Sequence, residues 1–390
     1  MDVLKLSLDK YLQYLECSNT ECFDYKFSPN SSPSPFSRCF AIFGLNLIDK
    51  LSYTPNERLN ICKLIRFDLD ELYNARKNKG FDMEKDKAYL QLLTFSLTSL
   101  SIIDTLGEDG LEDHCQRLIP RNVSEALDER NVKFGVPQSG NYAMFMAIIL
   151  LHATRFLNQN YSSKIDEWLA YHFKHMNRFG FWGNHLSMSH LQFQNGYHQY
   201  EIFDYLGVEN PKLENAADAV ALLADSRGRF APYPGGGACY DYDAVAIITS
   251  GGENVVTKHA NLLKRTYTSI LDDQNEDGGF CDSKYIRPRS FSNFLLAIKH
   301  TLNAKGLARK ERLRQTLTLL RPKYNRFMGA SHWTVDGYNR RWNESNLWDS
   351  YFRMSAIARI DKVLNSENSS KWNFVDYPGI GFHETSRKQA

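Results

Sequence analysis

The sequence predicts an all-α protein built as an α/α toroid, a closed ring in which inner helices are surrounded by outer helices. Helical segments that are apolar on most faces alternate with amphipathic ones. Similar segments recur about every 50 residues, as expected for units that must pack on their neighbours. We expect six to seven helical hairpins in one domain over residues 1–365, clearest over 134–365, and a tail over 366–390 that packs on the toroid. An open solenoid is the alternative, but neither end of the chain reads as a polar capping repeat.

The recurring segment is clearest at Asp277-Gly278-Gly279-Phe280, where a Gly pair gives the backbone freedom that a tight turn after a helix needs. A polar loop and an apolar helix follow it. Similar segments are Gly180-Phe181-Trp182-Gly183, Gly228-Arg229-Phe230 and His332-Trp333.

The elements follow in order from this alternation. A short amphipathic helix over 4–15 leads through a Ser- and Pro-rich loop to the first buried helix. The helices expected to be buried span 36–48, 88–106, 142–157, 192–205, 242–249, 291–302 and 347–364. The helices expected to be amphipathic span 58–77, 112–118, 163–178, 212–224, 254–272 and 308–324. Period-two alternation typical of strands is almost absent.

Composition excludes several classes of protein. The 390 residues carry 47 basic and 45 acidic side chains, so the net charge of +2 does not favour nucleic-acid binding. No apolar run reaches the roughly 18 to 20 residues that would span a bilayer, and no signal peptide is recognisable. Seven scattered cysteines without a CxxC pair indicate reduced thiols. We expect a cytoplasmic protein that is not integral to a membrane.

The turns resemble the repeat of the terpenoid cyclase and protein prenyltransferase superfamily. The matching segments are Gln274-x-x-Asp277-Gly278-Gly279-Phe280 and Asp225-x-x-Gly228-x-Phe230. The resemblance implies the α/α toroid and a structural role for these residues, which tie helix ends together. Zinc-dependent prenyltransferases hold their metal with Asp, Cys and His, and the matching stretch 289–293 has none of these. We therefore expect no metal or other cofactor.

Asp241-Tyr242-Asp243-Ala244 stands at a helix start and resembles the Asp-x-Asp-Asp motif of class II terpene cyclases. In that family the middle Asp protonates an alkene or an epoxide. The resemblance implies that Asp243 is the catalytic acid and Asp241 its partner, with Ala244 in place of the last Asp. Two carboxylates near a helix N-terminus can share a proton. The same residues also suit a helix cap, with Asp241 at the N-cap and Asp243 in the first turn.

Polar side chains crowd the loops that lead into the inner helices, and one end of a toroid carries all of these loops. Arginines there could clamp a diphosphate or a carboxylate, and tyrosines could stabilise a cation. The residues expected to bind the substrate are Arg287, Arg289, Arg340, Arg341, Tyr233, Tyr240, Tyr242, Asn293, Glu344 and Trp348.

His185, His190 and His198 lie five and eight residues apart, which is not a usual spacing for metal ligands. His198 with Tyr197 could instead form an acid/base pair.

Three functions therefore remain open. The first is a terpenoid cyclase-like enzyme that acts on an isoprenoid, or on a polar conjugate of one, by protonation from Asp243. The second is a carbohydrate-active toroid, a lyase or hydrolase, with His198, Tyr197, Arg341 and Glu344 in a polar cleft. The third is a toroid that binds a peptide or small molecule without catalysis.

Overall fold

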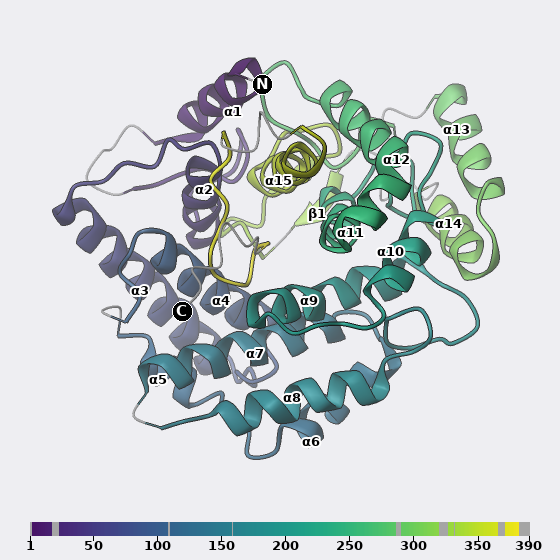
Figure 1. Cartoon of the computed structure of the whole chain (residues 1–390). Helices are drawn as coiled ribbons and strands as arrows, with labels where there is room; N and C mark the ends of the chain where they lie inside the picture. The colour runs from purple at the N-terminus through teal and green to yellow at the C-terminus, as the bar shows by residue number, and fades with distance from the viewer. Residues whose placement is uncertain are drawn as a thin grey trace.

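The computed structural model describes residues 2–17, 23–107, 110–157, 159–285, 290–319, 327–330, 332–365 and 371–381. Over these residues the protein is almost entirely helical, which confirms the predicted all-α class (Figure 1). In the part of the chain so described, no helix combines the length and the apolar character needed to cross a membrane.

The elements alternate long buried helices with shorter or amphipathic ones. The helices are α1 (Asp2–Leu15), α2 (Pro35–Leu47), α3 (Pro55–Asn78), α4 (Lys87–Ile102), α5 (Glu112–Gln116), α6 (Val123–Glu129), η1 (Val132–Phe134), α7 (Ser139–Phe156), α8 (Ser162–His175), α9 (His190–Leu206), α10 (Leu213–Ala221), α11 (Ala238–Ser250), α12 (Gly252–Asp272), α13 (Phe291–Leu302), α14 (Gly306–Leu319) and α15 (Leu347–Leu364). Two short antiparallel strands are β1 (Phe327–Ala330) and β2 (Asn339–Arg341).

Six helices form a closed circuit of contacts. Helix α2 packs on α4, α4 on α7, α7 on α9, α9 on α11, α11 on α15, and α15 returns to α2 (Figure 1). Most side chains of these six helices are buried. Outside them, α3 packs on α4, α8 on α7, and α10 and α12 on α11. Each of the six helices therefore buries side chains against two neighbours in the circuit.

Polar caps fix where four helices of this circuit begin. The side chains of Ser34, Asp86, Ser189 and Asn346 each accept the backbone N–H of the third helical residue, at the starts of α2, α4, α9 and α15. Each cap satisfies a donor that has no partner within the helix.

The same turn occurs three times on the outside of the circuit. Each turn begins at Asn177, Asp225 or Asn275, and the backbone N–H of this first residue donates to the carbonyl of the residue four positions later. The N–H of the third residue after it donates to the carbonyl of the first residue. That third residue is a glycine each time, with φ of 83°, 79° and 88° at Gly180, Gly228 and Gly278, a region that favours residues without Cβ.

The turn at Gly278 joins α12 to α15. Phe280 N donates to Ser350 Oγ at 2.9 Å, and Asn346 N donates to the Phe280 carbonyl at 3.0 Å. The turn thus ties helix ends together, which is the structural role that the resemblance implied.

Helix α13 corrects one prediction. The stretch 291–302 was expected to be buried, yet Phe291 is 76% exposed and Leu302 is 63% exposed. Helix α13 packs on α14 at the edge of the molecule, away from the circuit (Figure 1). The β1–β2 pair was also not expected, because its strands are too short to show an alternating pattern.

Residues 371–381 cross the molecule as an extended segment that ends among the circuit helices (Figure 1). The Pro378 carbonyl accepts the Thr98 hydroxyl of α4 at 3.0 Å, and the Ile380 carbonyl accepts the Tyr351 hydroxyl of α15 at 3.1 Å. The amides of Gly379 and Gly381 donate to one oxygen of Glu201, on α9, at 2.7 and 2.9 Å. This segment is therefore bound to three helices of the circuit.

Candidate functional site

A cavity of about 150 Å³ lies at the centre of the helix circuit. Its walls come from α4, α7, α9, α11 and α15, from Trp333, and from Gly379, Ile380 and Gly381 of the C-terminal segment. Four residues predicted from the sequence line it, namely Asp243, His198, Tyr197 and Trp348. This makes it the candidate functional site.

Asp243 is the most unusual group in the cavity. It is 2% exposed, and its Oδ2 has no hydrogen-bond partner. Burial raises the pKa of the Asp243 carboxyl well above its ordinary value, and the carboxylates of Glu201 and Asp241 raise it further. These surroundings therefore favour the neutral form of the Asp243 carboxyl over the charged form.

Asp241 lies two residues earlier on α11 and faces away from the cavity. Its Oδ2 is 2.7 Å from Arg353 Nη1 and 3.1 Å from Arg229 Nε, and its Oδ1 accepts Phe230 N at 2.9 Å. Burial raises the pKa of Asp241 to about 7, against the opposing charge of Arg229. Asp241 therefore ties the Gly228 turn to α11 and α15, and the geometry gives it no hydrogen bond to Asp243.

Polar groups occupy another part of the wall. His198 Nε2 lies 2.8 Å from Asn141 Nδ2, and its Nδ1 has no hydrogen-bond partner. Burial lowers the pKa of His198 to about 3, and the nearby charge of Lys87 lowers it further. Burial also lowers the pKa of Lys87 itself. Because the Asn141 amide donates to Nε2 in this arrangement, the neutral imidazole carries its proton on Nδ1.

Aromatic rings form the remaining wall. Trp333 and Trp348 stack with centroids 4.3 Å apart, and Trp348 lies 4.7 Å from Phe352. Phe95 and Tyr197 complete this side of the cavity. Such faces stabilise a positive charge that develops beside them.

A second polar cluster lies at the N-terminal ends of α11 and α15. Tyr233 donates to Asp282 Oδ2 at 3.1 Å, and Arg340 Nη1 is 3.3 Å from Asp349 Oδ2. Burial raises the pKa of Asp349 to about 7, opposed by Arg340. Tyr233 and Arg340 are thus engaged with the protein's own carboxylates.

The other residues predicted to bind substrate are dispersed. Tyr242 is buried beside Tyr197, with its hydroxyl 3.2 Å from Arg359 Nε, and Tyr240 packs edge-on against Phe193. Glu344 accepts the Tyr338 hydroxyl at 2.8 Å, outside the cavity. Of the remaining four, Arg341 is exposed, Asn293 lies on α13, and Arg287 and Arg289 fall outside the described residues.

The three histidines considered for a metal are not brought together. His185 is on an exposed loop. His190 is buried, with Nδ1 2.7 Å from the Phe230 carbonyl and Nε2 3.3 Å from Arg312 Nε, while only His198 lines the cavity. Among the residues that the structure describes, no group of three or more His, Cys, Asp or Glu side chains is placed to hold a metal ion.

Sequence reasoning missed several groups in the cavity. Lys87 is the first residue of α4, Glu201 lies within α9, and Cys239 is near the start of α11. None belongs to a motif. No signal singled out Glu201 either, because α9 also buries other polar side chains such as Gln192 and Asn195.

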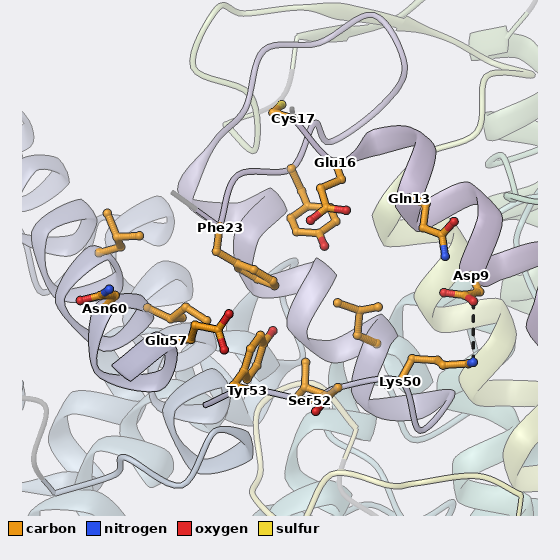
Figure 2. A pocket seen from close by; sticks show the side chains of 15 residues that line it. Asp9, Gln13, Glu16, Cys17, Phe23, Lys50, Ser52, Tyr53, Glu57 and Asn60 are labelled. Carbon is orange, nitrogen blue, oxygen red and sulfur yellow. Dashed lines mark ion pairs between the residues drawn. The ribbon is translucent and has the colours of Figure 1, made fainter. Parts of the chain in front are cut away.

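A hollow of larger volume, about 840 Å³, lies elsewhere, between α1, residues 50–53 and α3 (Figure 2). Its charged groups already have partners. Lys50 Nζ lies 4.0 Å from Asp9 Oδ2, and Glu57 accepts the Thr54 backbone N–H at 2.7 Å. None of the residues predicted from the sequence lines this hollow, so it is not the candidate site.

Comparisons of the chain with protein-family models, with curated proteins and with solved structures each gave no match, so its functional interpretation rests on the geometry above.

Proposed function

We propose that this chain is a terpenoid cyclase-like enzyme in which the Asp243 carboxyl acts as a general acid on a substrate bound in the central cavity. The single observation that carries the proposal is the buried Asp243 Oδ2, which has no protein partner and lies on the wall of a cavity with aromatic sides. The closed circuit of helices and the recurring turn support the α/α toroid that the sequence resemblance implies.

The environment of Asp243 favours one kind of substrate atom. Its raised pKa favours the protonated carboxyl but also makes that carboxyl a weaker acid. A weak acid transfers its proton more readily to oxygen than to an alkene carbon. We therefore infer an epoxide or a similar oxygen function, whose opening places a cation beside the rings of Trp348 and Phe352.

The cavity volume limits what can be enclosed. A cavity of about 150 Å³ is the size that accommodates benzene, whereas ligand pockets commonly measure about 300 to 1,000 Å³. One five-carbon isoprene unit fits, so we propose that the reacting end of the substrate enters the cavity. The rest of the substrate then extends past Lys87 and Gln194, which are only half-buried.

The test compares two carboxylates in two different hollows. Purified protein is first screened by thermal shift against isoprenoid alcohols, diphosphates and epoxides, since a ligand of the folded state raises its melting temperature. Turnover of the stabilising compound is then followed by mass spectrometry. We expect Asp243→Asn to lower turnover by roughly 100-fold or more, because general acids contribute about 10² to 10⁴. Asp9→Asn, in the larger hollow, leaves turnover unchanged.

Two results contradict this proposal. One is the absence of stabilisation by any isoprenoid. The other is an Asp243→Asn variant that keeps full turnover while Asp9→Asn loses it.

The polar wall favours a second candidate function, a lyase acting on a substrate that carries a carboxylate or carbonyl group. The observation behind it is a neutral His198 with an unused Nδ1 beside Lys87, which together offer a hydrogen-bond donor and a cation. Thermal shift with uronic-acid oligosaccharides tests this candidate. Here His198→Gln and Lys87→Met should abolish the response, while Asp243→Asn should preserve it.

A further inference from the structure

Helix α13 presents its apolar face to solvent. Phe291, Phe294, Leu295, Ile298 and Leu302 are 76%, 41%, 48%, 37% and 63% exposed. Because an α-helix turns by about 100° per residue, these five positions fall in one stripe along the helix. We call these five residues the α13 stripe. A helix on a protein surface ordinarily turns such a stripe toward the core, so the orientation here is inverted.

The protein side of α13 is polar. His300 and Thr301 are buried, and the His300 carbonyl accepts Arg312 Nη1, from α14, at 2.8 Å. Arg312 is 1% exposed and also donates to the Leu223 carbonyl. These contacts fix α14, and with it α13, on the rest of the molecule, so the stripe has a defined outward direction.

The exposed charged side chains of the α13–α14 hairpin (residues 291–319) are all cations. Lys299, Lys305, Arg309, Lys310 and Arg314 are all exposed on this hairpin. Its single acidic residue, Glu311, is turned inward, where it accepts the backbone N–H of His190 at 2.6 Å.

The sequence around the hairpin carries the same bias. Positions 284–326 hold twelve Lys or Arg residues and one acidic residue. The remaining 35 basic and 44 acidic residues give the rest of the chain a net charge of −9. The positive charge of the protein is therefore concentrated in this one segment.

We propose that the α13–α14 hairpin binds the surface of a membrane that contains anionic lipids, with the α13 stripe inserted among the acyl chains. An apolar stripe flanked by Lys and Arg is the arrangement of helices that lie in the plane of a bilayer. Charge complementarity selects this occupant over a second copy of the chain, since a symmetric dimer would bring the two sets of cations together. The proposal is independent of the reaction assigned to Asp243.

The experiment is flotation of the full chain with two kinds of vesicle. One is made of phosphatidylcholine alone, and the other of phosphatidylcholine and phosphatidylglycerol in equal amounts. We expect at least about tenfold stronger binding to the anionic vesicles, weakened by high salt.

Two variants and one control separate the contributions. Phe291→Ser/Leu295→Ser/Ile298→Ser and Lys299→Glu/Lys310→Glu should each lower binding at least about tenfold. The matched control is Leu59→Ser/Phe67→Ser on α3, where both side chains are also exposed, and it should bind as the parent does. Circular dichroism and thermal melting establish that each variant is folded.

Three outcomes overturn the proposal. The first is equal binding, or none, to the two vesicle types. The second is a dimer in sedimentation velocity that the serine variant dissociates, which would assign the stripe to a second copy. The third is RNA binding that the charge variant abolishes and the serine variant leaves intact, with no flotation.

Discussion

Asp241 and Asp243 are two carboxylates on one helix, both buried and only two residues apart, yet their surroundings are opposite. Asp241 contacts two guanidinium groups and a backbone amide. Asp243 faces the central cavity, and its Oδ2 contacts no donor. Since two residues of an α-helix turn the side chain by about 200°, the pair cannot face the same neighbours.

This difference separates a structural carboxylate from a candidate chemical one. A buried charge with partners holds elements together, and its loss leaves those partners unpaired. A buried acid without partners lowers the stability of the fold, and such groups concentrate where a protein does chemistry. The predictions below test this distinction, from the largest expected effect to the smallest.

The largest effect should come from the side of Asp241. We expect Arg353→Met to lower the free energy of unfolding by about 3 to 5 kcal/mol, because it leaves Asp241 buried with one guanidinium group. Urea unfolding measures this loss. As a control, Arg341→Met removes an exposed guanidinium and should change stability by about 0.5 kcal/mol or less. A loss below about 1 kcal/mol for Arg353→Met would show that the ion pair is dispensable.

In contrast to Arg353→Met, the substitution Asp243→Asn should raise the free energy of unfolding. The folded-state pKa of Asp243 lies above its unfolded value, so the wild type loses stability as pH rises from about 4 toward the folded pKa. Because Asn cannot ionise, the free energy of unfolding of the variant relative to the wild type should rise by up to about 1.4 kcal/mol per pH unit in that window. Urea unfolding at several pH values gives the difference.

Asp336→Asn is a control for which the change of stability with pH should have the opposite sign. Burial acts to raise the pKa of Asp336, yet hydrogen bonds from the Ser32 and Tyr338 backbones outweigh it and lower that pKa. Asp336→Asn should therefore lose stability relative to the wild type as pH rises through the ordinary carboxyl range. If the stability difference between Asp243→Asn and the wild type did not change with pH, Asp243 would not be a buried acid without a partner.

Glu201 provides an intermediate case, since this carboxylate accepts two backbone amides of the C-terminal segment. Glu201→Gln should cost about 1 to 2 kcal/mol, because the two hydrogen bonds lose their charge assistance. Amide exchange at Gly379 and Gly381 should become faster. Glu209→Gln, at an exposed position after α9, is the matched control. Unchanged exchange in Glu201→Gln would mean that other contacts hold the segment.

The smallest effect concerns His198, which should not titrate near neutral pH. Burial lowers its pKa to about 3, so its ring nitrogen signals should keep their neutral pattern from pH 7 down to about pH 4. Nitrogen-15 NMR of the folded protein checks this, with His198→Gln identifying the signals. Protonation near the ordinary histidine pKa would place His198 in contact with solvent rather than at a buried site.

The sequence allowed the helical class and the repeated turn to be predicted because both are local. Periodicity and a glycine at the fourth turn position need no tertiary information. The orientation of α13 could not be predicted in this way. The sequence pattern of an apolar stripe is the same whether the stripe faces a core or the solvent. Only the burial of His300 and Thr301 in the structure distinguishes these two orientations of α13.

The candidate site was accessible only in part. Asp243, His198, Tyr197 and Trp348 drew attention through motifs or chemistry, and all four line the cavity. Lys87 and the C-terminal glycines did not, because their role depends on helices distant in the chain meeting around one centre. Asp241 was paired with Asp243 by sequence spacing, whereas the helical turn separates them.

The position of Gly379, Ile380 and Gly381 in the wall of the cavity has a consequence for access to it. These residues and the preceding Pro378 are held by hydrogen bonds to α4, α9 and α15, so one wall of the cavity depends on a segment more than 130 residues away from Asp243 in the chain. Loss of these contacts would admit water beside the Asp243 carboxyl and move its pKa back toward the ordinary value.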